Sequence, residues 1–433
     1  MEKDQILRYL EDWNFWKIGP DTGIKRKSYL SKIMSSIKTK EIIVLSGVRR
    51  CGKSTLLMQL LDDIISKNDA KNTLIINLED PRVAEISVKD LMQVYETYLE
   101  VLRPEKDHFV VIDEVQDVLH WEKFARYLSE NKKVNVFITG SNSRFLSSEF
   151  SSALSGRYIE YRIMPLSFKE FLEFRDIIIT DERDFVRKEG KIKLLFEEYA
   201  YFGGFPKIVL TQDEGEKRKL LTSYYETILL KDISLRYKLK ETVKLRELSK
   251  FFLTNLSKII SINKIKTVLG VSLQTVQRFS SYLESSYLIY FVPKFDYSYK
   301  KQIANPKKIY AIDLGLRNNV AFQFSDDYGR VLENLVFLEL IRGGKEVYYY
   351  NTSNNLEIDF AVKEKNKVRE LIQVTASLED FNVREREIKS LTKGLKELKL
   401  KEGLILTKER EEVINEKSLK IKVKPVWKWL LGI

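Results

Sequence analysis

The chain has 433 residues, of which 44% are hydrophobic and 31% are charged, and its formal net charge is +12. This length is enough for about three domains, no apolar run approaches the ~20 residues of a membrane-spanning helix, and the N-terminus lacks a signal-peptide pattern, so we expect a cytoplasmic protein. The single cysteine excludes an intrachain disulfide and a thiolate metal site, and the presence of only two histidines argues against a histidine metal centre.

Residues 1–35 have the pattern of a helical lead-in, to which we assign no function. A complete G-x-x-x-x-G-K-[ST] motif follows between Gly47 and Ser54, with an apolar strand pattern before it at 42–45 and a helix pattern after it. In such a loop the backbone N–H groups close around phosphate, the lysine reaches the terminal phosphates and the hydroxyl binds Mg²⁺. We therefore predict a site for ATP and Mg²⁺ formed by Gly47, Arg49, Arg50, Cys51, Gly52, Lys53, Ser54 and Thr55.

A second apolar strand pattern, at 109–112, ends on two acidic residues, Asp113 and Glu114. At the carboxyl end of a strand, Asp113 is placed to hold Mg²⁺ beside Ser54. Glu114 is placed to orient and polarise the attacking water. The pair therefore predicts the second half of the nucleotide site.

A third strand pattern, at 134–139, leads into small polar residues. Asn142 is the predicted sensor of the γ-phosphate, with Ser141 as the other candidate and an ordinary turn after the strand as the alternative. Arg144 and Arg157 follow, and each is a candidate for the positive charge that stabilises the transition state, in trans if the protein forms a ring. The alternative for both arginines is a plain surface position.

These motifs, together with the Leu-Ser-Gly-Arg-Tyr run at 154–158 and the segment 164–171, resemble the archaeal and bacterial AAA+-type ATPases that carry an uncharacterised C-terminal extension. The double arginine Arg49-Arg50 is part of that family's pattern. The family usually has Thr after the loop lysine, whereas here Ser54 precedes Thr55, which keeps the hydroxyl ligand. The resemblance implies an ATPase core at 36–173, a helical lid at 174–240 and a homo-oligomer, with a hexameric ring as one form.

Residues 241–293 read as a winged helix-turn-helix, because two short capped helix patterns joined by Gly270 are followed by an apolar strand pattern at 283–292. The stretch 238–308 holds 14 Lys or Arg and 4 Asp or Glu, an excess that favours a nucleic-acid partner. We expect base contacts in the major groove from Gln274, Thr275, Gln277 and Arg278. We expect phosphate contacts from Lys264 and Lys266. The alternative is a winged helix used for packing or protein contact.

Residues 294–433 resemble the restriction-nuclease-like, PD-(D/E)xK fold, with a helix followed by three strand patterns. Strand alternation places Glu357 and Asp359 on one face, where with Glu333 they form a candidate site for a hard metal. The third strand should then supply an acid and a lysine, but it carries Gln373-Val374-Thr375 instead. We therefore predict a degenerate nuclease fold, kept for contact with DNA or protein.

Taken together, the sequence predicts a multidomain α/β protein that hydrolyses ATP with Mg²⁺ and couples this to DNA remodelling or translocation, with duplex or branched DNA and other copies of the chain as partners and no membrane. Three alternatives stay open. The first is a nucleotide-controlled oligomeric switch that acts on a protein partner, and the second is an ATP-dependent nuclease. The third is plain DNA binding that is not coupled to ATP.

Overall fold

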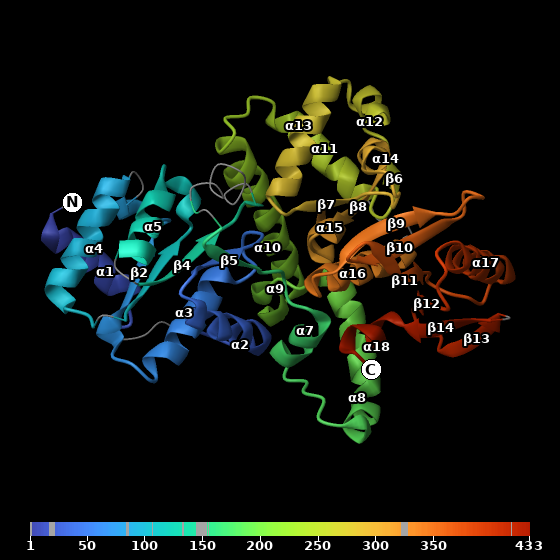
Figure 1. Ribbon diagram of the computed structural model, residues 1–433, viewed down its shortest axis with the longest axis horizontal. Coiled ribbons are helices and arrows are strands. Elements are labelled where there is room, and N and C mark those ends of the chain that lie inside the picture. The colour runs from blue at the N-terminus through green and yellow to red at the C-terminus, as the bar shows by residue number, and fades with distance from the viewer. Residues whose placement is uncertain are drawn as a thin grey trace. The chain divides into compact units, whose positions relative to one another are not determined.

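The computed structural model (Figure 1) describes residues 2–16, 22–83, 86–105, 107–131, 134–143, 154, 156–321, 328–416 and 418–433. The chain divides into two compact units, 1–163 and 164–433. Among the described helices, none combines the length and the apolar character needed to cross a membrane.

Unit 1 is built on a five-stranded parallel sheet in the order β2-β3-β4-β1-β5. The strands β1, β2 and β4 are buried along their whole length, as expected for a parallel sheet covered on both faces. The strands are β1 (Ile42–Ser46), β2 (Thr73–Asn77), β3 (Phe109–Asp113), β4 (Asn135–Gly140) and β5 (Tyr158–Arg162). The crossover helices include α3 (Lys53–Ile65), α4 (Val88–Leu102) and α5 (Trp121–Asn131). This core confirms the predicted α/β class.

The N-terminal residues form two helices, α1 (Lys3–Trp13) and α2 (Lys27–Ser36). The aromatic residues of α1 attach it to the sheet: the Tyr9 hydroxyl donates to the Asn77 carbonyl oxygen at 3.0 Å, and Trp13 Nε1 donates to Asp80 Oδ2 at 2.9 Å. Both acceptors lie at or just beyond the carboxyl end of β2. The lead-in therefore packs against the core of unit 1.

Unit 2 begins with helices that enclose an aromatic core, namely α7 (Phe168–Phe174), α8 (Glu182–Phe202), α9 (Pro206–Leu210), α10 (Glu214–Thr227) and a π-helical continuation at Ile228–Leu235. The Gly203-Gly204 turn after α8 is held from further along the chain, because the Gly204 N–H donates to Asp313 Oδ2 at 2.7 Å. A Cβ at Gly203 would lie 2.2 Å from Asp313 Oδ1, so this close approach requires glycine.

The middle of unit 2 combines four helices with a three-stranded antiparallel sheet in the order β6-β8-β7. The elements are α11 (Thr242–Thr254), β6 (Ile259–Ile260), α12 (Ile262–Leu269), α13 (Leu273–Ser285), β7 (Ile289–Val292), α14 (Tyr299–Ala304) and β8 (Lys307–Ala311).

Two sequence predictions for this region need correction. Residues 283–285, predicted as part of a strand, belong to α13, because Leu283 continues the buried helical spacing of Val276 and Phe279. The central strand of the sheet, β8, lies beyond residue 293, the end predicted for this part of the chain. Pairing between strands distant in sequence decided this boundary.

The C-terminal part of unit 2 has a six-stranded mixed sheet in the order β13-β14-β12-β11-β10-β9. The strands are β9 (Glu346–Asn351), β10 (Glu357–Glu364), β11 (Lys367–Val374), β12 (Glu402–Thr407), β13 (Glu412–Glu416) and β14 (Leu419–Pro425). The remaining helices are α15 (Leu314–Val320), α16 (Tyr328–Arg342), α17 (Phe381–Glu397) and α18 (Val426–Leu431). Helix α17 packs closely on this sheet: a Cβ at its Gly394 would lie 2.2 Å from Ile358 of β10.

Candidate nucleotide-binding site

The loop between β1 and α3 is shaped for phosphate. Three of its residues have positive φ, namely Gly47 at 150°, Arg50 at 70° and Gly52 at 95°. Gly52 is the N-cap of α3 and no side chain caps the helix there, so its first N–H groups are available to an anion. At the other end, a Cβ on Gly47 would lie 2.1 Å from the Ile163 carbonyl oxygen. The backbone thus fits the phosphate group that the motif implies.

Lys53 is buried and turned back over this loop. Its Nζ donates to the carbonyl oxygens of Gly47 at 3.2 Å and Val48 at 3.3 Å, and it lies 3.5 Å from Glu114 Oε1. An ammonium in this place supplies the positive charge that terminal phosphates need. Its position joins the loop to the acids at the end of β3.

Asp113 lies next to the loop hydroxyl, as the sequence predicts for a shared metal. Ser54 Oγ donates to Asp113 Oδ1 at 3.1 Å, and Thr139 Oγ1 donates to the same oxygen. Burial and the neighbouring Glu114 carboxylate raise the pKa of Asp113 to about 6. A hydroxyl beside a carboxylate presents the hard oxygen ligands that Mg²⁺ prefers, so these residues fit the ion.

Glu114 has a left-handed backbone, with φ of 58°, and its side chain is buried. Its N–H donates to Thr139 Oγ1 at 2.9 Å, and Gln116 Nε2 donates to its Oε2 at 2.5 Å. Burial by itself would raise the pKa of Glu114, but Lys53 and Arg49 outweigh it and hold the pKa below its usual value. The carboxylate is therefore ionised at neutral pH, as a residue that polarises water must be.

Thr139 is the residue that the sequence prediction missed. Strand β4 lies between β1 and β3, so its last residues reach the acids at the end of β3. The Thr139 hydroxyl accepts from Glu114 N–H and donates to Asp113, and so positions both acids. A threonine near the end of a strand carries no signal of its own, because only the strand order places it there.

We expect Thr139→Val, which keeps the shape but removes the hydroxyl, to slow ATP hydrolysis by about 10- to 100-fold, since hydrogen bonds to charged groups contribute about 1.5–3 kcal/mol. Steady-state phosphate release measures the effect. The matched control is Thr97→Val on α4, whose hydroxyl donates to the Gln93 carbonyl oxygen of its own helix at 2.8 Å. Equal rates in the two variants would contradict the role assigned to Thr139.

The other loop residues have different surroundings. Arg49 is buried and pairs with Glu79, just after β2, whereas Arg50 and Thr55 are exposed. Cys51 points away from the loop interior, with Sγ donating to the Ile163 carbonyl oxygen at 3.2 Å, and burial raises the pKa of its thiol. Only the backbone of Cys51 can therefore face a phosphate.

A second residue that the sequence prediction missed is Arg26. Its Nη1 donates to the Cys51 carbonyl oxygen at 3.1 Å, and its side chain is buried although it precedes the loop by more than twenty positions. Its neighbours Thr22 and Ile24 accept hydrogen bonds from Gln59 of α3. The segment before α2 thus supports the loop, through contacts that no local sequence pattern indicates.

The predicted sensor residues and Arg157 differ in how deeply they are buried. Ser141 and Asn142 are buried just after β4, and the Ser141 N–H donates to Gln116 Oε1 at 3.4 Å. Arg157, just before β5, is half exposed and pairs with Glu130 of α5. Arg144 lies outside the described residues. The structure thus brings the sensor residues to the edge of the sheet that holds Asp113.

In unit 2 the four residues predicted as a degenerate nuclease site are brought together. Glu333, Glu357, Asp359 and Gln373 all line a cavity of about 570 Å³. Lys308 of β8, which the sequence prediction missed, contacts three of them. Burial opposes its charge, but Asp359 and Glu333 hold the pKa of Lys308 well above its usual value.

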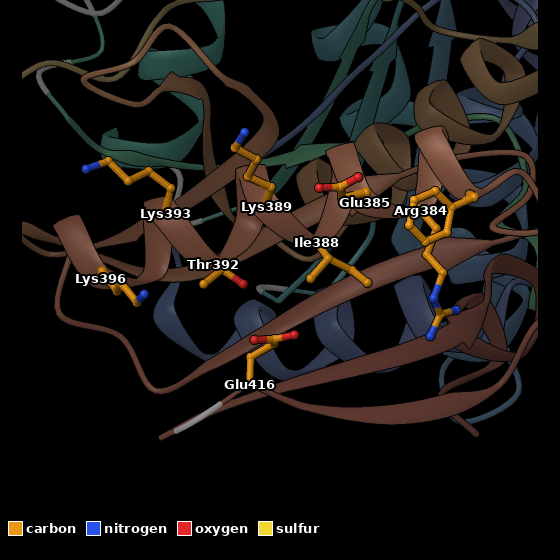
Figure 2. A pocket seen from close by; sticks show the side chains of 9 residues that line it. Arg384, Glu385, Ile388, Lys389, Thr392, Lys393, Lys396 and Glu416 are labelled. Carbon is orange, nitrogen blue, oxygen red and sulfur yellow. The ribbon is translucent and has the colours of Figure 1, made fainter.

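A second hollow, of about 500 Å³, lies between α17 and the end of β13 (Figure 2). Its lining combines apolar Ile388 with Lys389, Lys393 and Lys396, and Glu416 lies on the opposite side. Lys393 pairs with Glu397 one turn along the helix at 3.3 Å. Lys389 and Lys396 are exposed, so this side of α17 faces solvent.

Comparison with known proteins assigns the chain to a family. A model described as an AAA domain matches residues 39–172, and two models for domains of unknown function match 193–327 and 328–429. An uncharacterized protein of Methanocaldococcus jannaschii, MJ1544, is 35% identical over 405 residues, which cover 90% of this chain and 88% of the relative. An uncharacterized protein of Haemophilus influenzae is 33% identical over 352 residues, which cover 80% and 85%.

Solved structures are similar at a lower level. A Walker-type ATPase of Pyrococcus abyssi has a TM-score of 0.46 and 14% identity, over 70% of this chain and 99% of the other. The ORC1 protein of Aeropyrum pernix, solved in complex with DNA, has a TM-score of 0.33 and 12% identity, over 74% and 96%. From the AAA-domain match, the parallel-sheet core and the two long relatives, the chain belongs to the same family as the M. jannaschii and H. influenzae proteins, a family of AAA-type P-loop ATPases.

Proposed function

We propose that this protein is a Mg²⁺-dependent ATPase that binds DNA and couples ATP binding and hydrolysis to DNA remodelling or translocation. One observation carries the ATPase part: Lys53 and Ser54 of the loop lie within 3.5 Å of Glu114 and Asp113. Phosphate-binding and water-activating groups thus share one edge of the sheet. The AAA-domain match over the same residues supports this assignment.

Each side chain then has a distinct role. Lys53 binds the terminal phosphates, and Ser54 and Asp113 hold Mg²⁺. Glu114 orients the attacking water and accepts its proton, while Asn142 senses the γ-phosphate. When bound, MgATP supplies the phosphoanhydride bond that is cut. The working form in this proposal is a homo-oligomer, in which Arg157 or Arg144 completes the site of a neighbouring subunit.

The DNA part of the proposal rests on the middle of unit 2, which we interpret as a winged helix. In chain order it has a helix, a short strand, two helices joined at Gly270, and two strands separated by the short helix α14, with β8 central in the sheet. The second helix of the pair, α13, presents exposed Gln274 and Gln277. Both face solvent beside buried Val276, as required of groups that reach into a major groove.

The surface around α13 has the charge that DNA requires. Lys264 and Lys266 are exposed on α12. Arg278 is partly engaged, since its Nη2 lies 3.5 Å from Glu241 Oε2 in an exposed pair, and Thr275 is half-buried and bonded to its cap Ser272. We therefore propose phosphate contacts by the two lysines and base contacts mainly by the two glutamines.

The segment between β7 and β8 adds a second contact. It exposes Tyr297 and Tyr299, at 83% and 75%, next to exposed Lys300 and Lys301. Exposed tyrosines beside lysines suit base stacking combined with phosphate contact, which is typical of proteins that bind distorted or single-stranded DNA. This favours branched or partly open DNA over plain duplex.

The test compares ATP hydrolysis without DNA and with duplex, single-stranded and branched DNA. We expect branched DNA to stimulate the rate of ATP hydrolysis several-fold. We expect the double variant Lys264→Gln/Lys266→Gln to bind DNA more weakly and to lower the slope of log affinity against log salt concentration by about two. The control is Lys67→Gln/Lys89→Gln, which removes the same charge from exposed positions of unit 1. A slow rate that no DNA changes would overturn the DNA coupling and favour the nucleotide-controlled switch.

A further inference from the structure

Three carboxylates that line the cavity in the C-terminal part of unit 2 contact the buried ammonium of Lys308. Lys308 is 1% exposed, and its Nζ lies 3.0 Å from Glu333 Oε1, 2.7 Å from Glu357 Oε1 and 2.8 Å from Asp359 Oδ1. The three carboxylates come from α16 and β10, and the lysine from β8. The Lys308 ammonium therefore lies where carboxylates from two elements converge.

The nuclease-like pattern implies a hard metal ion bound by these carboxylates. A divalent cation bound by these oxygens would lie about 2.0–2.6 Å from each. The ammonium already occupies the point shared by all three. The other oxygen of Asp359, Oδ2, already accepts the Val374 N–H at 2.8 Å. The described residues therefore do not fit a metal at this point unless Lys308 leaves.

Two further contacts complete the arrangement. The Tyr310 hydroxyl, from the same strand as Lys308, donates to Glu333 Oε1 at 2.6 Å. The third strand supplies the neutral Gln373, whose Oε1 accepts from the Asp359 N–H at 3.4 Å, and so adds no charge that would require a second cation. Among the described residues, no group of three or more His, Cys, Asp or Glu is arranged to hold a metal.

We propose that the Lys308 ammonium takes the permanent place of a divalent cation, so that the C-terminal part of unit 2 is a metal-free module that does not cut phosphodiesters. Metal-assisted hydrolysis needs an ion that activates water, and an ammonium with no lone pair cannot do this. The cluster instead acts as an internal clamp that joins β8 to α16 and β10. Because β8 is also the central strand of the β6-β8-β7 sheet, the clamp ties that sheet to the C-terminal part of the unit.

The proposal predicts that removing the charge of Lys308 creates a metal site. In Lys308→Met the carboxylates keep their places but lose this cation. Glu387 lines the same cavity and accepts from Arg386 through Oε1, and its buried Oε2 becomes a further ligand oxygen. We expect Lys308→Met to melt at a temperature several degrees lower than the wild type, and added Mn²⁺ to restore most of this loss.

The experiment measures Mn²⁺ binding to the full chain by electron paramagnetic resonance, with saturating ADP so that the nucleotide site is filled in every sample. We expect the wild type to bind Mn²⁺ at the nucleotide site alone, Lys308→Met to bind one more ion, and Lys308→Met/Asp359→Asn to lose that extra ion. Lys307→Met is the matched control, because its side chain alternates to the other face of β8.

Two results would overturn the proposal. The first is a second Mn²⁺ bound by the wild type and lost in Asp359→Asn, or Mn²⁺-dependent DNA cleavage with the same sensitivity. The second is a folded Lys308→Met that binds no extra ion. If Lys308→Met does not fold, the comparison of Mn²⁺ binding by the wild type and by Asp359→Asn still tests the proposal. None of these outcomes depends on whether DNA stimulates ATP hydrolysis.

Discussion

Replacing Glu114 with glutamine slows ATP hydrolysis by about 10²–10⁴-fold and leaves nucleotide binding nearly unchanged, because the side chain loses the ability to accept a proton. Glutamine keeps the size of the side chain and an oxygen that can still face Gln116 Nε2. Lys53, Ser54 and Asp113 keep their places, so ATP and Mg²⁺ still bind. Single-turnover phosphate release, together with the affinity for a fluorescent ATP analogue, separates the two effects.

Asp113→Asn is the informative comparison for Glu114→Gln. It removes a charge from the same strand end but acts on the residue beside Ser54, so we expect weaker Mg²⁺-dependent nucleotide binding. Glu100→Gln, at an exposed ion pair with Lys3, controls for loss of one acid in unit 1. If Glu114→Gln hydrolysed ATP at the wild-type rate, another residue would have to activate the water.

Gly47→Ala is expected to remove nucleotide binding and to destabilise unit 1 by about 1–3 kcal/mol or more, the usual range for overpacking. The new methyl group would meet the Ile163 carbonyl oxygen at 2.1 Å, and the φ of 150° strains any side chain. This oxygen belongs to the backbone, so it cannot rotate away as a side chain would. Thermal unfolding with and without ATP measures both effects.

Gly190→Ala is the control for that substitution. Gly190 lies inside α8, and a Cβ there would meet nothing within 4 Å. Since alanine is the better helix former, we expect stabilisation of about 0.5–1 kcal/mol. A similar loss of stability in both variants would show that the effect at Gly47 is not due to the close approach of Ile163.

How far the sequence could be interpreted differs between the two units. In unit 1 the strands are runs of apolar residues, and the loop motif needs only the residues from Gly47 to Ser54, so the α/β core followed from local patterns. In unit 2 the boundary predicted at residue 293 left β8 out of the part of the chain that contains β7. The place of β8 in that sheet depends on its pairing with β7, which no local pattern indicates. Residues 283–285 were misassigned because Leu283 lies just before the apolar run that forms β7, whereas its burial follows the helical spacing of Val276 and Phe279.

The amino-acid sequence by itself therefore determined the phosphate loop, the two acids after β3 and the parallel-sheet class, because each depends on residues that are neighbours in the chain. Only the tertiary structure decided that Thr139 supports both acids, since β4 must first pair between β1 and β3. It also decided that Lys308 meets Asp359, 51 positions away, whereas the end of the third strand has Gln373-Val374-Thr375 in place of the expected acid and lysine. Contacts of this kind arise when strands pair and buried charges find partners, and no spacing along the chain indicates them.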